Sequence, residues 1–493
     1  VVIVSGDMQN MLSSTVELLK DCQKNGVAVV ALGTPGNYVD GLEKPEVFTE
    51  LAKGWQSLPS LDALGNFLTT TIGKRIESSN NWLQGVSHMR RVMEDGTEAI
   101  FFVNHHLGTF ETTLTLNGDS VEQWNLFTGE KEGIPYQKKT GKVTFDLKLA
   151  RNQSVMLALN TGAKSVPAPQ PQNMVPAALT LKGILRESDN LLMNEYCDFQ
   201  FAGKTYPDMH VIAATDLVFR ARGYDGNPWD NKVQFRNTLM DTNNFAPGTG
   251  FTCRYKFYVE EGFQPERLQV IYEQRDLVHL QINGNDVSPI EGETPLDHRN
   301  GVCDITALIK DGENVVSVIA DQFDVRLEIE AIFLRGTFSV DANGDQWILR
   351  PERELDYGSW KTQGLPFYGN AVNYGYEVEL AKAPQKAILS VPGCETTCMS
   401  VTVNGSDAGL VGADGLSQKE IATYLQAGKN EIVLRVCGSL KNLLGPHHAT
   451  STLRGTAWPA MWRNAPRFKQ PDPDSYDLID YGLMEPIQLI TEG

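Results

Sequence analysis

Positive charge is scarce in this sequence. Its 43 lysine and arginine residues are outnumbered by 61 aspartate and glutamate residues, which gives a formal net charge of -18. A protein that binds nucleic acid presents a basic face to the phosphates, so this balance argues against a nucleic-acid partner. The balance is equally unlike a surface that docks on anionic membranes, and no apolar run approaches the length of a membrane span. We therefore expect neither nucleic acid nor a membrane among the partners.

Cysteine is also infrequent, and its spacing forms no regular disulfide framework. The chain has 7 cysteines, of which Cys253 and Cys303 lie within or beside apolar strands, where a free thiol acts as a small buried side chain. Three interpretations stay open for Cys394, Cys398 and Cys437: a disulfide, part of a zinc site, or free thiols. A zinc site needs four ligands, and no fourth ligand is apparent. Unpaired cysteines favour the cytoplasm, while a periplasmic or secreted location stays open.

An initiating methionine and a signal peptide are both missing from the start of the sequence. Val1 opens an apolar stretch, Val1–Val4, without a charged segment before it. We expect the chain to be the C-terminal part of a longer protein, so its compartment is unknown.

A pattern that occurs twice dominates the second half of the chain. Each copy begins with a strand of alternating apolar and polar residues that ends in Asn-Gly, at Val278–Gly284 and at Met399–Gly405. Alternation buries one face of a strand, and Asn-Gly supplies the positive φ angles of a tight hairpin. Each copy continues through a short helical turn to a Gly-x-Asn corner, at Gly312–Asn314 and at Gly428–Asn430, before a long strand. The repeat predicts two related β-sandwiches, a fold that often holds or flanks carbohydrate.

The first 75 residues are typical of an α/β domain. An apolar strand that ends near Ser5 leads to a helix whose start is marked by the capping-box pattern Ser14–Glu17 and whose end is marked by Gly26. A second apolar strand, Val27–Leu32, follows. Strand, helix and strand in this order predict a parallel, doubly wound sheet.

Residues 76–162 change to a β pattern. Ala99–Asn104 and Ser154–Leu159 are two of the apolar strands, and the segment predicts a small antiparallel sandwich. Four prolines then fall within a short polar stretch. This composition predicts an extended, semi-rigid linker over residues 163–177.

Four stretches in order along the chain carry a resemblance to a known family. They are Ser87–Arg91 with Glu98–Asn104, Trp124–Gly129, Gly358–Gly369, and Asn442–His448 with Tyr481–Pro486. They resemble the strand pair after the flavodoxin-like domain, the W-(D/N)-x-x-T-G turn, the entry into the last sandwich and the closing galactose-binding-like module of the large bacterial α-L-rhamnosidase-like glycoside hydrolases. Together the four stretches span nearly the whole chain, and their order makes the assignment of the domains specific. The resemblance is less specific for the sugar, because hydrolases of several glycans share these modules.

The resemblance implies a mainly β fold in several pieces. A partial flavodoxin-like α/β domain is followed by a small β-sandwich, the linker and two galactose-binding-like jelly rolls. The expected ranges are 1–75, 76–162, 163–177, 178–340 and 341–493.

The resemblance also implies that the catalytic (β/α)8 barrel lies N-terminal to these modules. Glycosidases of this type use two carboxyl groups that flank the scissile bond. In the family both lie on the barrel, upstream of Val1, so no catalytic residue is assigned to this chain. The expected partners are an oligosaccharide or glycan substrate and the upstream barrel of the same chain.

The long stretch over residues 440–474, before the closing strand, is the candidate glycan site. It is rich in His, Trp, Arg and Pro, and irregular stretches of this length tend to be functional or to cover another domain. Aromatic rings can stack on sugar rings, while His, Asn and Arg can bond hydroxyl groups. Internal packing of the stretch is the alternative. The candidate contacts are Asn442, His447, His448, Arg454, Trp458 and Trp462.

No metal or cofactor is assigned from the sequence. One segment has the spacing of a calcium loop, but Gln346 stands where such a loop needs glycine, so a turn between domains is the better interpretation. Structural calcium elsewhere on a sandwich stays open without a location. The acidic loop with Asp225, Asp230 and Asp241 is interpreted as a solvated surface. The residues of the calcium-like spacing are Asp341, Asn343, Asp345 and Glu352.

The resulting hypothesis is the accessory C-terminal portion of a glycoside hydrolase that acts on α-L-rhamnosides or similar glycans. Such a portion would brace the barrel, contact glycan and have no activity alone. The alternative is a non-catalytic carbohydrate-binding or adhesive protein built of sandwiches. A third hypothesis, small-molecule binding by the loop with Gly33 and Gly36, rests on those two glycines only, because their spacing matches no nucleotide fingerprint.

Overall fold

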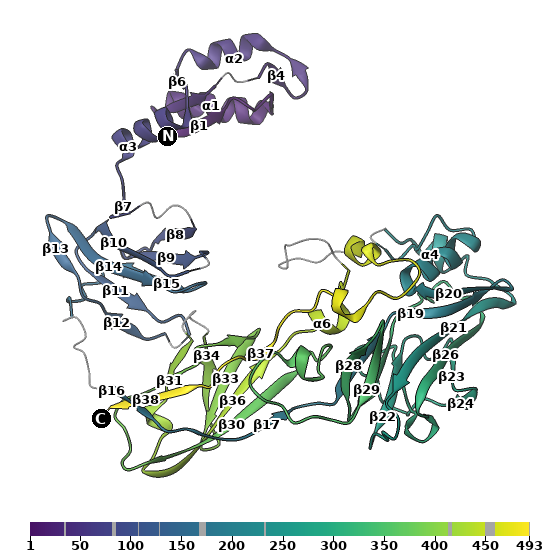
Figure 1. Ribbon diagram of the computed structural model, residues 1–493. Helices are drawn as coiled ribbons and strands as arrows, with labels where there is room; N and C mark the ends of the chain where they lie inside the picture. The colour runs from purple at the N-terminus through teal and green to yellow at the C-terminus, as the bar shows by residue number, and fades with distance from the viewer. Residues whose placement is uncertain are drawn as a thin grey trace. The chain divides into compact units, whose positions relative to one another are not determined.

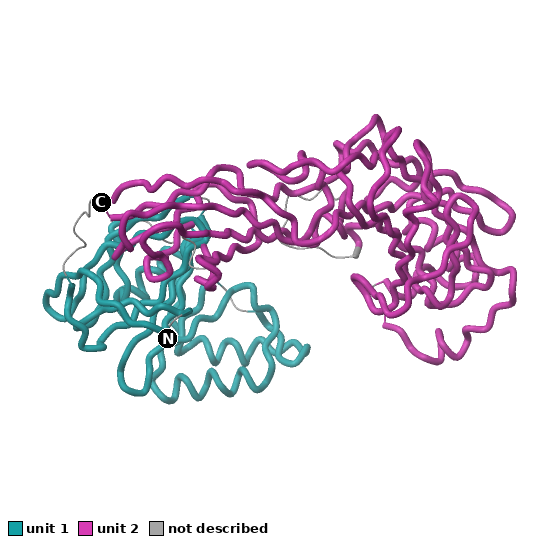
Figure 2. The backbone as a smooth tube through the Cα atoms, turned by 90° about the horizontal axis from the view of Figure 1, so that it is seen from below, with its two compact units in different colours: residues 1–169 teal, residues 170–493 magenta. Residues whose placement is uncertain are grey.

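The chain folds into two compact units. The computed structural model describes residues 1–33, 36–80, 85–106, 108–127, 129–166, 174–230, 233–412, 417–448 and 459–492. The units are residues 1–169 and 170–493 (Figure 2), so the division falls within the proline-rich stretch. Both units are built mainly of β-strands in several sheets (Figure 1).

The first unit begins with a parallel sheet and its helices. The strand order is β1 (Val2–Ser5), β3 (Val29–Leu32) and β6 (Trp55–Leu58), all parallel, as the alternation of strand and helix predicts. A second small sheet joins β2 (Asn10–Met11), β4 (Tyr38–Val39) and β5 (Leu42–Glu43). Apolar side chains of the strands and of the first two helices form a shared core. The helices are α1 (Ser13–Lys24), α2 (Pro45–Ala52) and α3 (Leu61–Ile72).

The start of α1 differs from the sequence-based prediction. The helix begins at Ser13, and its N-cap, Leu12, makes no side-chain capping bond, so the predicted capping box is wrong. Instead the amide of Ser13 donates to Asp40 Oδ1 at 2.9 Å. A carboxylate from a distant turn therefore satisfies a free amide at the positive end of the helix dipole. Gly26, with φ of +72°, lies just beyond the helix end, as predicted.

The rest of the first unit is an antiparallel sandwich. One sheet has the order β13 (Gln137–Lys139), β14 (Lys142–Leu149), β10 (Phe110–Asn117) and β7 (Ile76–Ser78). The other has the order β12 (Lys131–Gly133), β11 (Val121–Trp124), β15 (Ser154–Leu159), β9 (Glu98–Asn104) and β8 (Val86–Val92). Alternate residues of these strands point into one apolar core.

The second unit contains two further sandwiches, of which the first carries the candidate site. Its smaller sheet has the order β18 (Asn190–Asn194), β27 (Ile332–Gly336), β22 (Leu268–Tyr272) and β25 (Gly301–Asp304). Helix α4 (Val211–Ala221) directly follows the edge strand of the larger sheet, and α5 (Arg236–Leu239) follows later. The larger sheet has the order β20 (Lys204–His210), β19 (Tyr196–Phe201), β21 (Pro247–Val259), β26 (Gly312–Gln322), β23 (His279–Ile282) and β24 (Asn285–Val287). In addition, β29 (Gln346–Arg350) pairs with β21, and β28 (Ser339–Asn343) pairs with β29.

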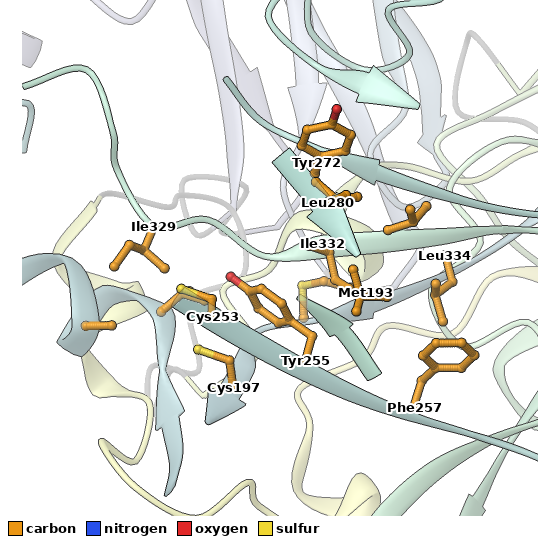
Figure 3. Close-up of a cluster of buried hydrophobic side chains, with 14 of the residues drawn as sticks. Met193, Cys197, Cys253, Tyr255, Phe257, Tyr272, Leu280, Ile329, Ile332 and Leu334 are labelled. Carbon is orange, nitrogen blue, oxygen red and sulfur yellow. The ribbon is translucent and has the colours of Figure 1, made fainter. Parts of the chain in front are cut away.

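Figure 3 shows part of the core of this sandwich. On β21 the side chains of Phe251, Cys253, Tyr255 and Phe257 are all buried, while the residues between them are partly or fully exposed, which is the outcome that alternation predicts. The hydroxyl of Tyr255 donates to the backbone oxygen of Glu330 at 2.7 Å. The polar end of this large side chain is therefore satisfied inside the core.

The last sandwich includes strands from both ends of the second unit. One sheet has the order β16 (Met174–Ala177), β38 (Gln488–Glu492), β31 (Ala387–Ser390) and β35 (Gln418–Glu420). The other has the order β17 (Thr180–Arg186), β30 (Ala371–Leu380), β36 (Gly428–Cys437), β33 (Cys398–Val403) and β34 (Ser406–Val411). The short strands β32 (Cys394–Glu395) and β37 (Gly482–Leu483) pair with each other in a separate antiparallel sheet.

Sheet membership thus differs from the expected ranges 163–177, 178–340 and 341–493. Residues 174–177 were expected in the linker, but they form β16 and pair with β38. Residues 180–186 were expected in the first jelly roll, but they form β17 and pair with β30 of the last sandwich. Conversely β28 and β29 attach to the first sandwich. A strand has free hydrogen-bonding groups along both edges, and the available edge decides which sheet it joins.

The repeat has the same geometry in both copies. Asn283 and Asn404 each have φ of +51° at the predicted hairpin turn. The side-chain Nδ2 of Asn283 donates to Asn314 Oδ1 at 2.9 Å, and the side-chain Nδ2 of Asn404 donates to Asn430 Oδ1 at 2.8 Å. Both acceptors are almost completely buried. The Asn of the turn and the Asn of the Gly-x-Asn corner are therefore hydrogen-bonded partners, which explains why the two motifs occur together.

Candidate functional site

The irregular C-terminal segment packs on the first sandwich of the second unit. It contains α6 (Lys441–Leu444), then the 3-10 turns η4 (Pro459–Asn464) and η5 (Pro473–Ser475). In Figure 1 this yellow segment lies beside α4, and the amide of His210, the last residue of β20, donates to the oxygen of Arg467 at 3.1 Å. Of the two roles suggested for such a stretch, covering another sandwich is the one that the structure shows.

A buried glutamate ties this segment to the sandwich. Glu195 lies between β18 and β19 and is 5% exposed. Its Oε1 lies 2.9 Å from Nε2 of His448, and its Oε2 lies 3.3 Å from Nε2 of His210. Nδ1 of His447 lies 4.0 Å from Oε2. We call Glu195, His210, His447 and His448 the histidine cluster.

The backbone assigns the ring protons of His210 and His447 in this cluster. Nδ1 of His210 accepts from the amide of Ile212 at 3.2 Å, so its proton is on Nε2 and is donated to Glu195. Nε2 of His447 lies 2.9 Å from the backbone oxygen of Asn442, which can only accept. When this ring is neutral, its Nδ1 is unprotonated, and it has no hydrogen-bond partner among the described residues. A lone pair thus faces a buried carboxylate, and protonation of His447 would turn this contact into an ion pair.

Burial and hydrogen bonding oppose one another at Glu195. Burial alone would raise the pKa of Glu195, but the hydrogen bonds from His210 and His448 outweigh it and hold this pKa below the ordinary 4.5. Burial lowers the pKa of His447 below the ordinary 6.5, although the charge of Glu195 acts in the other direction. At neutral pH the cluster is therefore a carboxylate held by ring N–H groups, with a neutral His447 beside it.

Acidification is expected to destabilise the second unit in two steps. The folded state favours neutral His447, so the stability from this group is present above its ordinary pKa of 6.5 and is lost as the pH falls below that value. The folded state favours ionised Glu195, whose contribution is present above 4.5 and is lost at lower pH. The check is the free energy of unfolding in urea at pH values of about 7.5, 5.5 and 4. The Glu195→Gln variant should lose most of the second step, and a free energy that is flat across the range would contradict this assignment.

A cavity of about 600 Å³ adjoins the histidine cluster, and His210 lies in its wall. Its other walls come from α4, from the loop over residues 225–230, from residues 328–330 and from residues 462–467. A volume of this size lies within the range of pockets that hold small ligands. The residues of interest in the lining are Asp216, Arg220, Asp225, Asn227, Trp229, Asp230, Glu328, Glu330, Trp462, Arg463 and Arg467.

Two tryptophans line this cavity with their indole nitrogens already bonded. Nε1 of Trp229 donates to the oxygen of Val325 at 2.7 Å, and Nε1 of Trp462 donates to the oxygen of Leu444 at 2.8 Å. Both side chains are half-buried. Each ring is therefore held in a fixed orientation, and its remaining surface is apolar, as required for stacking on a flat apolar ligand face.

Acidic groups outnumber cations in the cavity lining, by five aspartate and glutamate residues to three arginines. The arginines have acidic partners: Arg220 contacts Asp216 at 2.8 Å, Arg467 lies 3.9 Å from Asp216, and Arg463 pairs with Asp230. The lining therefore retains acceptor groups and presents little unpaired positive charge.

Glu328 and Glu330 form the acidic end of the cavity. Glu328 Oε1 accepts a hydrogen bond from the side-chain Nδ2 of Asn227 at 2.6 Å. The Glu330 residue is exposed at the cavity, but protein atoms crowd its carboxyl group on the other sides, and this desolvation, with the charges of Glu273 and Glu328, raises its pKa to about 8. A carboxyl group that is protonated at neutral pH can donate a hydrogen bond, while Glu328 beside it accepts.

The structure separates the predicted site residues into three groups. Asn442 and His447 are buried, and the amide group of Asn442 is bonded to the backbone of Ile479 at 2.8 Å in both directions. His448 bonds Glu195 and is nearly buried, so these three side chains serve internal packing. Trp462 lines the cavity. Arg454 and Trp458 lie outside the described residues, and their contact with sugar stays a prediction.

The sequence did not indicate the other half of the candidate site. Of the acidic loop interpreted as a solvated surface, Asp225 and Asp241 are exposed, as expected, whereas Asp230 is partly buried and pairs with Arg463. Asp225 and Asp230 also line the cavity beside Trp229, whose ring packs on the core of the sandwich. Glu195 carried no clear signal, since polar Asn194 precedes it between two strands and a glutamate at such a position is usually exposed. Glu328 and Glu330 carried none, because only the fold brings them to the cavity.

The calcium-like spacing has a structural explanation. Asp341 and Asn343 lie on β28, and the chain turns back at once into β29, so a hairpin occupies this segment. Asp341 pairs with Arg353 and lies 3.5 Å from Arg350. Within the ranges that the structure describes, no group of three or more His, Cys, Asp or Glu side chains is arranged to hold a metal ion. In the same ranges no helix is both long and apolar enough to cross a membrane.

The chain is similar to several solved structures at low identity. A rhamnosidase from Novosphingobium sp. PP1Y aligns with 99% of this chain and 33% of its own length, at 12% identity and a TM-score of 0.46. An exo-carrageenase from Bacteroides ovatus aligns with 32% of this chain and 22% of its own, at 14% identity and a TM-score of 0.23. A β-D-mannosidase from Dictyoglomus thermophilum aligns with 50% of this chain and 31% of its own, at 11% identity and a TM-score of 0.21.

No family model matches the sequence, and neither does any curated protein sequence. The three similar structures are glycoside hydrolases. This chain spans about a third of the rhamnosidase and less of the other two. The activity and the substrates of the whole protein are therefore put forward as proposals.

Proposed function

We propose that this chain is the accessory C-terminal portion of a glycoside hydrolase similar to α-L-rhamnosidases, and that it binds a neutral sugar. The observation that carries the sugar site is the cavity with two fixed indole rings and hydrogen-bonding carboxyl groups. A sugar ring has an apolar face and a rim of hydroxyl groups, so it needs an aromatic surface beside several acceptors and donors. The resemblance of the four sequence stretches supports the kind of enzyme, and bracing of an upstream barrel is part of the same proposal.

The charge of the cavity favours a neutral sugar over an acidic one. Asp225, Glu328 and Glu330 present carboxyl groups to the cavity, whereas the arginines are engaged with Asp216 and Asp230. A uronate or sulfated sugar would bring another negative charge to these groups, and none of the described lining residues offers it a free cation. Glu328 can accept from a sugar hydroxyl, and protonated Glu330 can donate to one.

The test is calorimetric titration of the whole chain with L-rhamnose and, separately, with D-glucuronate. We expect binding of L-rhamnose and no measurable heat with D-glucuronate. Replacing Trp462 by alanine is expected to weaken L-rhamnose binding about tenfold, which corresponds to an aromatic contact of about 1.4 kcal/mol.

Trp124→Ala is the matched control, because Trp124 is also half-buried but lies on β11 of the other unit. Its affinity should equal that of the unsubstituted chain. Unchanged affinity in folded Trp462→Ala would show that the sugar does not bind on this ring and would rule out the cavity as its site.

One observation favours a second candidate function. A carboxyl group with a pKa of about 8 beside the acceptor Glu328 resembles the division of roles between the acid and the carboxylate of a glycosidase. We expect the isolated chain to be inactive on aryl glycosides, since both catalytic carboxyl groups of the proposed parent lie on the barrel. Hydrolysis of aryl α-L-rhamnosides by this chain, abolished by Glu330→Gln, would instead make the cavity itself the active site.

A further inference from the structure

Two cysteines lie directly opposite each other in the last sandwich. Cys398 is the first residue of β33, Cys437 is the last residue of β36, and the two are paired residues of these antiparallel strands. Directly opposite residues in such a pair have Cα atoms about 4.5–5.5 Å apart. A disulfide joins Cα atoms about 4.4–6.8 Å apart, so the backbone already has the spacing that a disulfide needs. Both thiols are free in this structure.

The two thiols differ in access. Cys398 is exposed, whereas Cys437 is half-buried. Burial raises the pKa of the Cys437 thiol to about 11, and the neighbouring Cys398 thiol acts in the same direction. Because the thiolate is the attacking species and must reach its target, Cys398 is the thiol that reacts first and Cys437 the one that reacts second.

A fixed cation lies beside this pair. Nη1 of Arg435 contacts Sγ of Cys437 at 2.9 Å. The same guanidinium donates from Nε and Nη2 to the two oxygens of Glu187, at 2.6 and 2.7 Å. This two-point ion pair fixes the guanidinium where it stabilises a developing thiolate on Cys437.

Cys394, Cys197 and Cys253 lack this combination of pairing and access. Cys394 lies opposite Leu483, so no thiol faces it across its strand pair. Cys197 and Cys253 are close enough for their thiols to hydrogen-bond, but both are buried in the core shown in Figure 3. A reagent in solution therefore reaches Cys398 and Cys437 but does not reach Cys197 and Cys253.

We propose that Cys398 and Cys437 form a modification site at which a low-molecular-weight disulfide oxidises both thiols to a cross-strand disulfide. The Cys398 thiolate attacks one sulfur of the reagent, forms a mixed disulfide and releases one reagent thiolate. Cys437 then loses its proton to solvent and attacks Sγ of Cys398, which releases the second reagent thiolate. The two protein thiols thus lose two electrons and two protons, and the reagent disulfide gains them as two thiols. This site is independent of the sugar cavity.

The test uses the whole chain and oxidised glutathione as the reagent. After incubation, the remaining thiols are alkylated, the protein is digested without reduction, and the peptides are identified by mass spectrometry. The expected product is a peptide pair linked between Cys398 and Cys437, with the number of alkylated thiols in the unfolded protein reduced by two. In Cys437→Ser the expected product is glutathione held on Cys398, because the second attack is removed.

Cys197→Ser is the matched control, since it removes a thiol of the buried pair and should leave the linked peptide unchanged. In Cys398→Ser neither the link nor glutathione on Cys437 is expected, because the entry thiol is missing. Glutathione retained on Cys398 in the unsubstituted chain, without a link to Cys437, would overturn the proposal. A link from Cys398 to Cys394 would overturn it as well.

Discussion

Replacing Glu195 by alanine is expected to lower the free energy of unfolding of the second unit by about 3–5 kcal/mol. The change removes the carboxylate that bonds His210 and His448 and leaves the buried ring N–H of His210 and the nearly buried one of His448 without this partner. A loss of this size is a large share of the stability of an ordinary domain, about 5–15 kcal/mol. The measurement is urea unfolding, with hydrogen exchange of β19 and β20 to locate the effect.

Two variants separate the charge from the side chain. Glu195→Gln keeps one acceptor and nearly the same shape, so its loss should be smaller than that of Glu195→Ala. Glu431→Ala changes an exposed glutamate of β36 and should shift the free energy by no more than about 0.5 kcal/mol. Equal stabilities of Glu195→Ala and Glu431→Ala would show that the histidine cluster does not hold the C-terminal segment on the sandwich.

Replacing Trp360 by alanine is expected to destabilise the last sandwich by about 3–5 kcal/mol. This side chain is 1% exposed and packs between Tyr368 and Tyr481, with ring centroids 5.9 and 6.3 Å away. Its Nε1 also donates to the hydroxyl of Tyr374 at 2.9 Å. The substitution therefore creates a large cavity and removes a buried hydrogen bond at once.

Trp360→Phe distinguishes these two effects. It retains most of the ring volume and loses the indole N–H, so its loss should be about 1–3 kcal/mol. The readout is urea unfolding with hydrogen exchange of β30 and β36, the strands that form this core. A Trp360→Ala loss below that of Trp360→Phe would contradict the packing described for this side chain.

The hairpin turns and the alternating strands could be predicted from the sequence, because neighbouring residues determine them. The Asn-Gly hairpins at Asn283 and Asn404 follow from the positive φ that these residues tolerate. The alternating strand β21 follows from its apolar period. The hydrogen bond from Asn283 to Asn314 could not be predicted, because neither motif indicates which residue 31 positions away will contact it.

Distance along the chain explains the errors in the expected ranges. Residues 174–177 have the composition of a linker, yet β16 pairs with β38 at the far end of the chain. Alternation and composition indicate that a segment is extended, and they carry no information about which edge it joins. The same limit applies to β17, whose partner β30 begins at Ala371.

The candidate site shows the same limit for side-chain chemistry. His447 and His448 have the donors and acceptors that a sugar site needs. The ring of His448, however, is hydrogen-bonded inside the protein to Glu195, which lies 253 residues earlier in the chain. Trp462 was identified because an aromatic ring in an irregular segment is informative by itself. Trp229 was missed because its acidic neighbours suggested a solvated loop, whereas its ring packs on the core.

A crystal structure of the whole chain grown with L-rhamnose would show whether the cavity beside α4 holds a neutral sugar. We expect electron density for one sugar inside the cavity, in contact with Trp229 and Trp462 and within hydrogen-bonding distance of Glu328 or Glu330. An empty cavity with the sugar bound elsewhere on the chain, at a concentration that saturates binding in solution, would contradict this expectation.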